Sequence, residues 1–127
     1  MLRKILAVDD SALIHQMYKL FLSRYKNCKL ISAMNGLEAL DKLGQEDGID
    51  LILLDINMPE MDGYETAQWL KTNHPDVKVL ALSMYDNETS IIRMLKCGAR
   101  GYILKDSEPA ELKAAIHALM DKGFYYS

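Results

Sequence analysis

The sequence predicts an α/β domain of the doubly wound type, a (βα)5 chain whose five parallel strands form one sheet with helices on both faces. Five short apolar runs of strand length alternate with five segments whose apolar residues recur at helical spacing. Strict alternation with short connections is typical of parallel sheets. With 127 residues, the chain is too short for an eight-unit barrel, which needs about 250 residues.

Length and composition indicate one globular domain spanning residues 1–127. Half of the residues are hydrophobic and 26% are charged, which is ordinary for a globular protein. The net charge of −3 argues against a surface for binding nucleic acid. The two cysteines, Cys28 and Cys97, fit no metal-binding spacing, so we expect free, buried thiols in a reducing compartment. No apolar run suits a signal peptide or membrane span, and we expect a soluble, cytoplasmic protein.

The first strand is expected at residues 5–8, and it ends directly in two carboxylates, Asp9 and Asp10. Ser11 or Asp10 can cap the helix that follows. This helix has one apolar stripe at Leu13, Met17, Leu20 and Phe21, widened by a second stripe at Ile14, Tyr18 and Leu22. A broad buried face explains the width better than a partner surface does, so we expect both stripes to be buried.

The second and third strands are expected at residues 30–34 and 51–54. Between them Asn35 can cap a helix that Gly44 or Gly48 ends. The run at 51–54 is wholly apolar, as in a strand buried on both faces, and it ends on Asp55. Because burying an unpaired carboxylate is costly, Asp55 should lie at the end of the strand, where ligands bind in open α/β sheets.

The second half of the chain repeats the pattern. A helix is expected at residues 63–73, a strand at 77–82 that ends at Ser83, and a helix from about 86 to 97 that stops before Gly98. The fifth strand, residues 102–104, leads into Lys105. Pro109 suits the first turn of the last helix, with Ser107 or Glu108 as its cap and Gly123 at its end.

Polar residues therefore follow four of the five strands, and they suggest one chemical site. If the first and third strands are neighbours, Asp9, Asp10 and Asp55 converge. Two carboxylates ~4 Å apart repel by about 4 kcal/mol at an effective dielectric near 20, so a cation is required. Oxygen ligands without His or Cys favour Mg²⁺. With Lys105 and the Ser83 hydroxyl added, the set suits phosphoryl transfer with Asp55 as nucleophile.

Each of these residues also has a simpler explanation. Asp9 and Asp10 could only cap a helix, Lys105 could be a solvated turn residue, Ser83 could bond its own backbone, and Asp55 could cap a turn. Their joint position at the carboxyl ends of successive apolar strands favours the site.

From about residue 4 to 123, the chain resembles the response-regulator receiver domains of two-component signalling, the CheY-like family. The matching segments are residues 8–10, 54–59, 61–63, 81–83 and 98–105. The resemblance implies strand order 2-1-3-4-5 and a phosphoryl group accepted by Asp55 from a sensor histidine kinase or a phosphotransfer protein. It implies Mg²⁺ held by Asp9, Asp10, Asp55 and the backbone carbonyl of Asn57. Lys105 would pair with the phosphoryl group, and Ser83 and Tyr102 would form the switch pair that senses it.

Residues 98–106 and the last helix are similar to receivers of the LuxR/NarL-type transcription factors. Those carry a helix-turn-helix output domain after the receiver, so we expect a truncated chain rather than a stand-alone receiver, with DNA bound only through that absent domain. Receivers of this type often pair through their last helices, so we also expect a homodimer.

Many receivers have a proline directly after the lysine, joined to it by a cis peptide bond. Here Asp106 follows Lys105, and a cis bond without proline costs about 2.5–4 kcal/mol.

Two other functions share this architecture. A flavin- or nucleotide-binding domain would cradle phosphate on a Gly-, Ser- or Thr-rich loop, whereas the first loop here is acidic. A Mg²⁺-dependent phosphatase with an aspartyl nucleophile would carry the motif Asp-x-Asp-x-Thr on its first strand. Here the expected nucleophile, Asp55, follows the third strand, and the second acid of that motif is missing. We expect a switch with only self-catalysed phosphoryl transfer and dephosphorylation, not a metabolic enzyme. His15, His74 and His117 are expected to be solvated, away from strand ends and without a catalytic role.

Overall fold

A computed structural model of the chain describes residues 3–25, 27–56, 63–83, 88–105 and 109–125. Its elements alternate without exception. They are β1 (Arg3–Val8), α1 (Ala12–Leu22), β2 (Cys28–Ala33), α2 (Gly36–Gln45), β3 (Ile49–Asp55), α3 (Gly63–Asn73), β4 (Lys78–Ser83), α4 (Glu88–Lys96), β5 (Gly101–Leu104) and α5 (Pro109–Lys122). The five strands are parallel in the order β2-β1-β3-β4-β5. The predicted fold class and strand order are confirmed.

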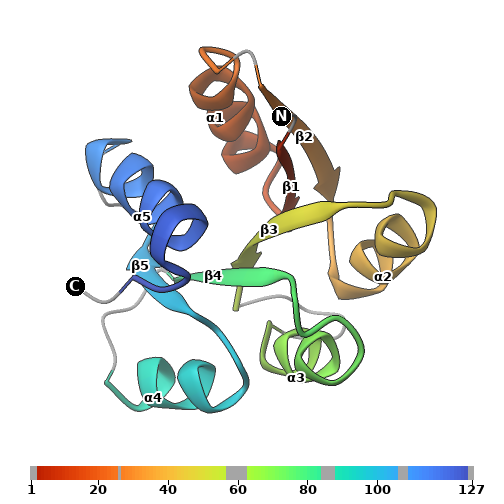
Figure 1. The fold of residues 1–127 in the computed structure, drawn as a ribbon, viewed down its shortest axis with the longest axis vertical. Helices are drawn as coiled ribbons and strands as arrows, with labels where there is room; N and C mark the ends of the chain where they lie inside the picture. The colour runs from red at the N-terminus through yellow and green to blue at the C-terminus, as the bar shows by residue number, and fades with distance from the viewer. Residues whose placement is uncertain (1–2, 26, 57–62, 84–87, 106–108, 126–127) are drawn as a thin grey trace.

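The sheet separates two hydrophobic cores, because successive strand side chains point to opposite faces. On β1, Ile5 and Ala7 pack against α1 and α5, whereas Leu6 and Val8 belong to the core under α2, α3 and α4. Figure 1 shows this division, with α1 and α5 on one side of the sheet and the other three helices on the opposite side. The central strand β3 contributes side chains to both cores, as its apolar run at residues 51–54 predicts.

The structure decides between the alternative caps and ends that were predicted for the first two helices. Ser11, not Asp10, caps α1, because its side chain accepts from the Ile14 amide. Asn35 caps α2 as expected, with its Oδ1 accepting from the Glu38 amide at 2.9 Å. Gly44 lies inside α2 and does not end it, whereas Gly48, with φ of +77°, lies in the loop that follows. The expected caps of α5, Ser107 and Glu108, lie outside the described residues.

The expectation that α1 buries both of its apolar stripes is wrong. Tyr18 and Leu22 are buried, but Leu13, Met17 and Leu20 are 67%, 47% and 72% exposed. The two stripes lie side by side on the helix, and the sheet covers only one of them. In the other stripe Leu13, Met17 and Leu20 form an exposed apolar surface on the outer side of the helix, whereas Phe21 packs against the core.

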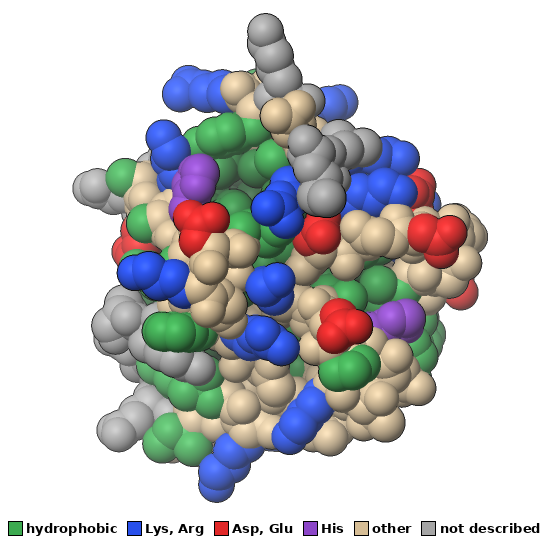
Figure 2. Space-filling model, in the orientation of Figure 1, with side chains coloured by type: hydrophobic (Ala, Val, Ile, Leu, Met, Phe, Trp, Pro, Cys, Tyr) green, Lys and Arg blue, Asp and Glu red, His purple; other side chains and the backbone are tan. Residues whose placement is uncertain are grey.

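Helices α1 and α5 leave hollows between them. One, of about 190 Å³, lies at the amino ends of the strands and is lined by Phe21, Tyr25 and Ile116 among others. On the face seen in Figure 2, hydrophobic side chains show in a hollow in the upper part, with charged side chains of both signs around it.

Cys28 and Cys97 are unpaired, as expected, but both are half-buried and not buried as predicted. Among the described residues, no helix has the length and apolar character needed to span a bilayer.

Candidate functional site

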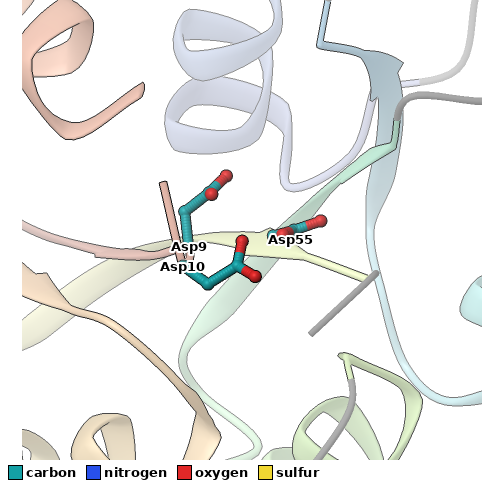
Figure 3. A group of neighbouring side chains, drawn as sticks. All are labelled: Asp9, Asp10 and Asp55. Atoms are coloured by element: carbon teal, nitrogen blue, oxygen red, sulfur yellow. The ribbon is translucent and has the colours of Figure 1, made fainter. Parts of the chain in front are cut away.

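The carboxyl ends of β1 and β3 bring three carboxylates together. The two strands are neighbours, with Val8 paired to Leu54, so Asp9 and Asp55 leave the sheet at the same level. One ligand oxygen each from Asp9, Asp10 and Asp55 lies within 4.8 Å of the others, and Figure 3 shows the three side chains gathered at this edge. Asp9 and Asp55 are each only 1% exposed, whereas Asp10 is open to solvent. The predicted convergence of these three residues is what the structure has.

Lys105 supplies the cation that this cluster needs. Its Nζ lies 2.8 Å from Asp9 Oδ2 and 3.0 Å from Asp55 Oδ2, and its side chain is 8% exposed. The Lys105 backbone amide donates to the Ser83 carbonyl at 2.8 Å, which holds the residue at the end of β5. Burial opposes the charge on the ammonium, but its contacts with Asp9 and Asp55 outweigh burial and raise the pKa of Lys105.

The donor set fits a small, hard divalent cation. All three candidate ligands are carboxylates, and the cluster contains no His or Cys side chain among the described residues. Two of them are buried, so their mutual repulsion is poorly screened by solvent. Asp10, at the open side, leaves room for the waters that Mg²⁺ usually keeps. Asn57, the expected fourth ligand, lies outside the described residues.

Ser83 and Tyr102 lie on the two strands next to this cluster. Ser83 ends β4 and is buried, and Tyr102 is a buried residue of β5. Ala81 pairs with Tyr102, and both belong to the core under α2, α3 and α4. Because Ser83 is two residues beyond Ala81, it points to that same face of the sheet.

The Lys105–Asp106 peptide bond, whose cis or trans form the sequence left open, lies outside the described residues.

The prediction that His15 is solvated and away from the strand ends is wrong. His15 Nε2 lies 2.7 Å from the backbone carbonyl oxygen of Asp9, and the residue is only partly exposed. Sequence reasoning missed it because the sequence does not show in which direction a side chain in the first turn of a helix points. The only signal was its spacing of six residues from Asp9, which depends on how the helix leaves the strand.

Tyr18 forms part of the wall behind the cluster. It lines a cavity of about 340 Å³ between α1, α5 and the ends of β4 and β5, together with Lys105 and Ile103. Burial, followed by the negative charges of Asp9 and Asp55, raises the pKa of the Tyr18 phenol well above its ordinary value. The Tyr18 hydroxyl therefore stays protonated at the wall of this cavity.

This shift predicts a loss of stability at alkaline pH. Below pH 10 the Tyr18 phenol holds its proton in both states, but above pH 10 the unfolded chain loses it first. At pH 11 this difference should cost the wild type about 1.4 kcal/mol. Urea unfolding at pH 8 and pH 11 should show a correspondingly smaller loss in Tyr18→Phe. Equal losses in both proteins would contradict a raised pKa of the Tyr18 phenol in the folded chain.

The fold and the cluster together define a doubly wound domain with an acidic, lysine-bridged site at the carboxyl ends of its strands. The family model described as "Response regulator receiver domain" matches residues 5–117. The chain belongs to this family, so it is a response-regulator receiver domain of the two-component type, a signalling switch rather than a classical enzyme.

Several of the similar proteins are regulators of the LuxR/NarL type. The chain is 34% identical over 122 residues to the transcriptional regulatory protein DegU of Brevibacillus brevis, covering 96% of the chain and 52% of DegU. It is 35% identical over 114 residues to the nitrate/nitrite response regulator NarL of Escherichia coli K12, covering 89% of the chain and 52% of NarL. The chain thus spans about half the length of these relatives. The predicted resemblance is confirmed.

Solved structures agree with the fold. A LuxR-family response regulator from Aurantimonas sp. SI85-9A1 superposes with a TM-score of 0.88 at 25% identity, covering 100% of this chain and 90% of that one. The chemotaxis protein CheY4 of Vibrio cholerae gives 0.85 at 28% identity, covering 92% and 98%. The two alternative functions, a flavin or nucleotide carrier and a phosphatase, receive no support from these matches.

Proposed function

We propose that the chain is a phosphorylation-dependent switch in which Asp55 accepts a phosphoryl group from a sensor histidine kinase or a phosphotransfer protein. The observation that carries the proposal is the position of the Lys105 ammonium, within 3.0 Å of both Asp9 and Asp55, at a cluster of three carboxylates. A buried nucleophile with a cation already beside it is the arrangement that phosphoryl transfer needs, because the reaction depends on positioning and charge neutralisation.

In the proposed transfer, one Asp55 carboxylate oxygen attacks the phosphorus in line. The new O–P bond forms as the P–N bond of the donor phosphohistidine breaks, and the imidazole leaves with the electron pair. Asp9, Asp10, Asp55 and the Asn57 carbonyl would hold Mg²⁺, which supplies neutralisation of the phosphoryl oxygens. Lys105 would turn from the carboxylates to the phosphoryl group, which adds about −1.5 to −2 charge.

The response to phosphorylation would run through Ser83 and Tyr102. In this proposal the Ser83 hydroxyl bonds a phosphoryl oxygen, and Tyr102 moves into the space that Ser83 leaves. The loop after β4, which was expected to follow Ser83, lies outside the described residues. Supporting this, the two side chains point to the same face from adjacent strands. The affected surface would consist of α4, β5 and α5, a local change that biases a two-state face.

The output proposed for this switch is control of transcription. DegU is a transcriptional regulatory protein, and the matched region is about half of its length. We therefore propose that residues 1–127 form a single receiver domain that acts on DNA only through an output domain outside these residues. Pairing of two receivers through α5 would be one way to couple phosphorylation to that output.

Intact-mass spectrometry tests the proposed phosphorylation. The purified chain is incubated with acetyl phosphate and Mg²⁺, and a parallel sample contains excess chelator. We expect the mass to rise by one phosphoryl group with Mg²⁺ and to stay unchanged with chelator. No increase in the presence of Mg²⁺, or an equal increase with chelator, would contradict the proposal.

A further inference from the structure

His15 contacts the site from the first turn of α1. Its Nε2 lies 2.7 Å from the carbonyl oxygen of Asp9, at the point where β1 ends. A backbone carbonyl can only accept a hydrogen bond, so Nε2 must carry the ring proton. The ring therefore acts as a donor toward the backbone of a proposed metal ligand.

This bond completes a set of contacts that fixes Asp9. The Asp9 amide donates to the Ala33 carbonyl at 3.1 Å, and Asp9 Oδ1 accepts from the Ser11 amide at 2.9 Å. Asp9 Oδ2 pairs with Lys105 at 2.8 Å. With His15 on the carbonyl, every polar atom of Asp9 has a partner. The carboxylate consequently has little freedom to turn away from the cluster.

The Asp9 carbonyl is also the one that joins Asp9 to Asp10. A peptide unit is planar, so a bond to its oxygen fixes the orientation of the whole plane and thus the direction in which both neighbouring side chains start. Asp9 and Asp10 are two of the three carboxylates in the cluster. His15 thus contacts the peptide unit that joins two of these three carboxylates.

The other ring nitrogen of His15, Nδ1, lies in an unfavourable environment. Nδ1 is buried and has no hydrogen-bond partner among the described residues. Leaving a buried polar atom unpaired is unfavourable, and native structures usually avoid it. The ring keeps this unfavourable position while Nε2 makes a short contact with Asp9.

We propose that His15 is a positioning residue of the site: its Nε2–H group holds the Asp9–Asp10 peptide plane so that both carboxylates face Asp55, and this raises the affinity of the cluster for Mg²⁺. The inference deepens the proposed function and rests on it, because it assigns His15 to the same site. In this role His15 would touch neither the phosphoryl group nor the metal and would act only through Asp9.

Two substitutions separate positioning from a merely structural role. His15→Leu removes the N–H donor and puts an apolar side chain of comparable size in place of the ring. His15→Gln retains an amide N–H group that can reach a nearby carbonyl. Gln16→Leu, at the next position of the same helix, is the matched control because Gln16 is exposed and makes none of the contacts described above.

The first measurement is the Mg²⁺ dissociation constant. It is obtained from the shifts of backbone amide signals in NMR titrations of the full chain with Mg²⁺. Loss of a group that orients a metal ligand typically weakens metal affinity 10–100-fold, and we expect about tenfold in His15→Leu. His15→Gln should keep most of the wild-type affinity, and Gln16→Leu should keep all of it. Equal affinities in His15→Leu and Gln16→Leu would overturn the proposal, as would a loss in His15→Gln as large as that in His15→Leu.

The second measurement needs neither metal nor phosphate. The ¹⁵N spectrum of the His15 ring in the wild type should show the proton on Nε2, protected from exchange with solvent. A ring protonated only on Nδ1 would overturn the proposal even if His15→Leu failed to fold. If wild-type mass does not rise with acetyl phosphate but His15→Leu still weakens Mg²⁺ binding, the proposed function fails and the positioning role stands. If instead the wild-type mass rises but His15→Leu binds Mg²⁺ as tightly as the wild type, the proposed function stands and the positioning role of His15 fails.

Discussion

Asp55→Asn is expected to abolish phosphoryl uptake completely while leaving the chain folded. The asparagine amide has nearly the same shape as the carboxylate but is neutral and is not a nucleophile, so no O–P bond can form. Folding should survive, because Lys105 keeps its 2.8 Å ion pair with Asp9. Intact-mass spectra recorded over a range of acetyl phosphate concentrations should show no phosphorylated species at any concentration.

Asp50→Asn provides the matched control. Asp50 belongs to the same strand, β3, but lies near its amino end, where its carboxylate accepts from the Lys4 amide at 3.1 Å. The same chemical change at this end of the strand should leave phosphoryl uptake at the wild-type level. Phosphorylation that persists in Asp55→Asn would place the acceptor elsewhere, and equal loss in both variants would indicate a folding defect.

Much of the site could be predicted because parallel strands simplify the geometry. Every strand of such a sheet ends at the same edge, so a polar residue directly after an apolar run is placed by the strand itself. Asp9, Asp55 and Ser83 each follow this rule, and the structure brings Asp9 and Asp55 together as expected. The strand order came from the resemblance, because the apolar runs alone do not say which strands are neighbours.

The parts that sequence failed to predict depend on how elements meet. Leu13 and Ile14 begin two equally regular apolar stripes on α1, and only the packing of the helix on the sheet decides which stripe is buried. The His15 contact depends on the angle at which α1 leaves β1. Similarly, Lys105 was expected at a strand end, but its bridge between Asp9 and Asp55 requires its long side chain to reach past β4 to the carboxylates.

Lys105→Met should be strongly destabilising in the absence of a divalent cation. The substitution keeps the unbranched apolar stem and removes only the charge that Asp9 and Asp55 share. Both carboxylates are 1% exposed, and removing one partner of a buried ion pair typically costs 3–5 kcal/mol. We expect the free energy of unfolding, measured with urea at pH 7 in chelator, to fall by about 3 kcal/mol.

Two comparisons would establish the origin of this loss. Lys78→Met, at the amino end of β4, changes a lysine that makes no ion pair within the described part of the chain, and it should cost about 0.5 kcal/mol or less. Mg²⁺ at ten times its dissociation constant should return about 1.4 kcal/mol to Lys105→Met, because only the folded chain gathers the three carboxylates. A loss in Lys105→Met no larger than in Lys78→Met would show that solvent already screens the two aspartates and that the cluster needs no cation to fold. A large loss that Mg²⁺ does not relieve would mean instead that the missing ammonium disturbs packing around the cavity rather than the balance of charge.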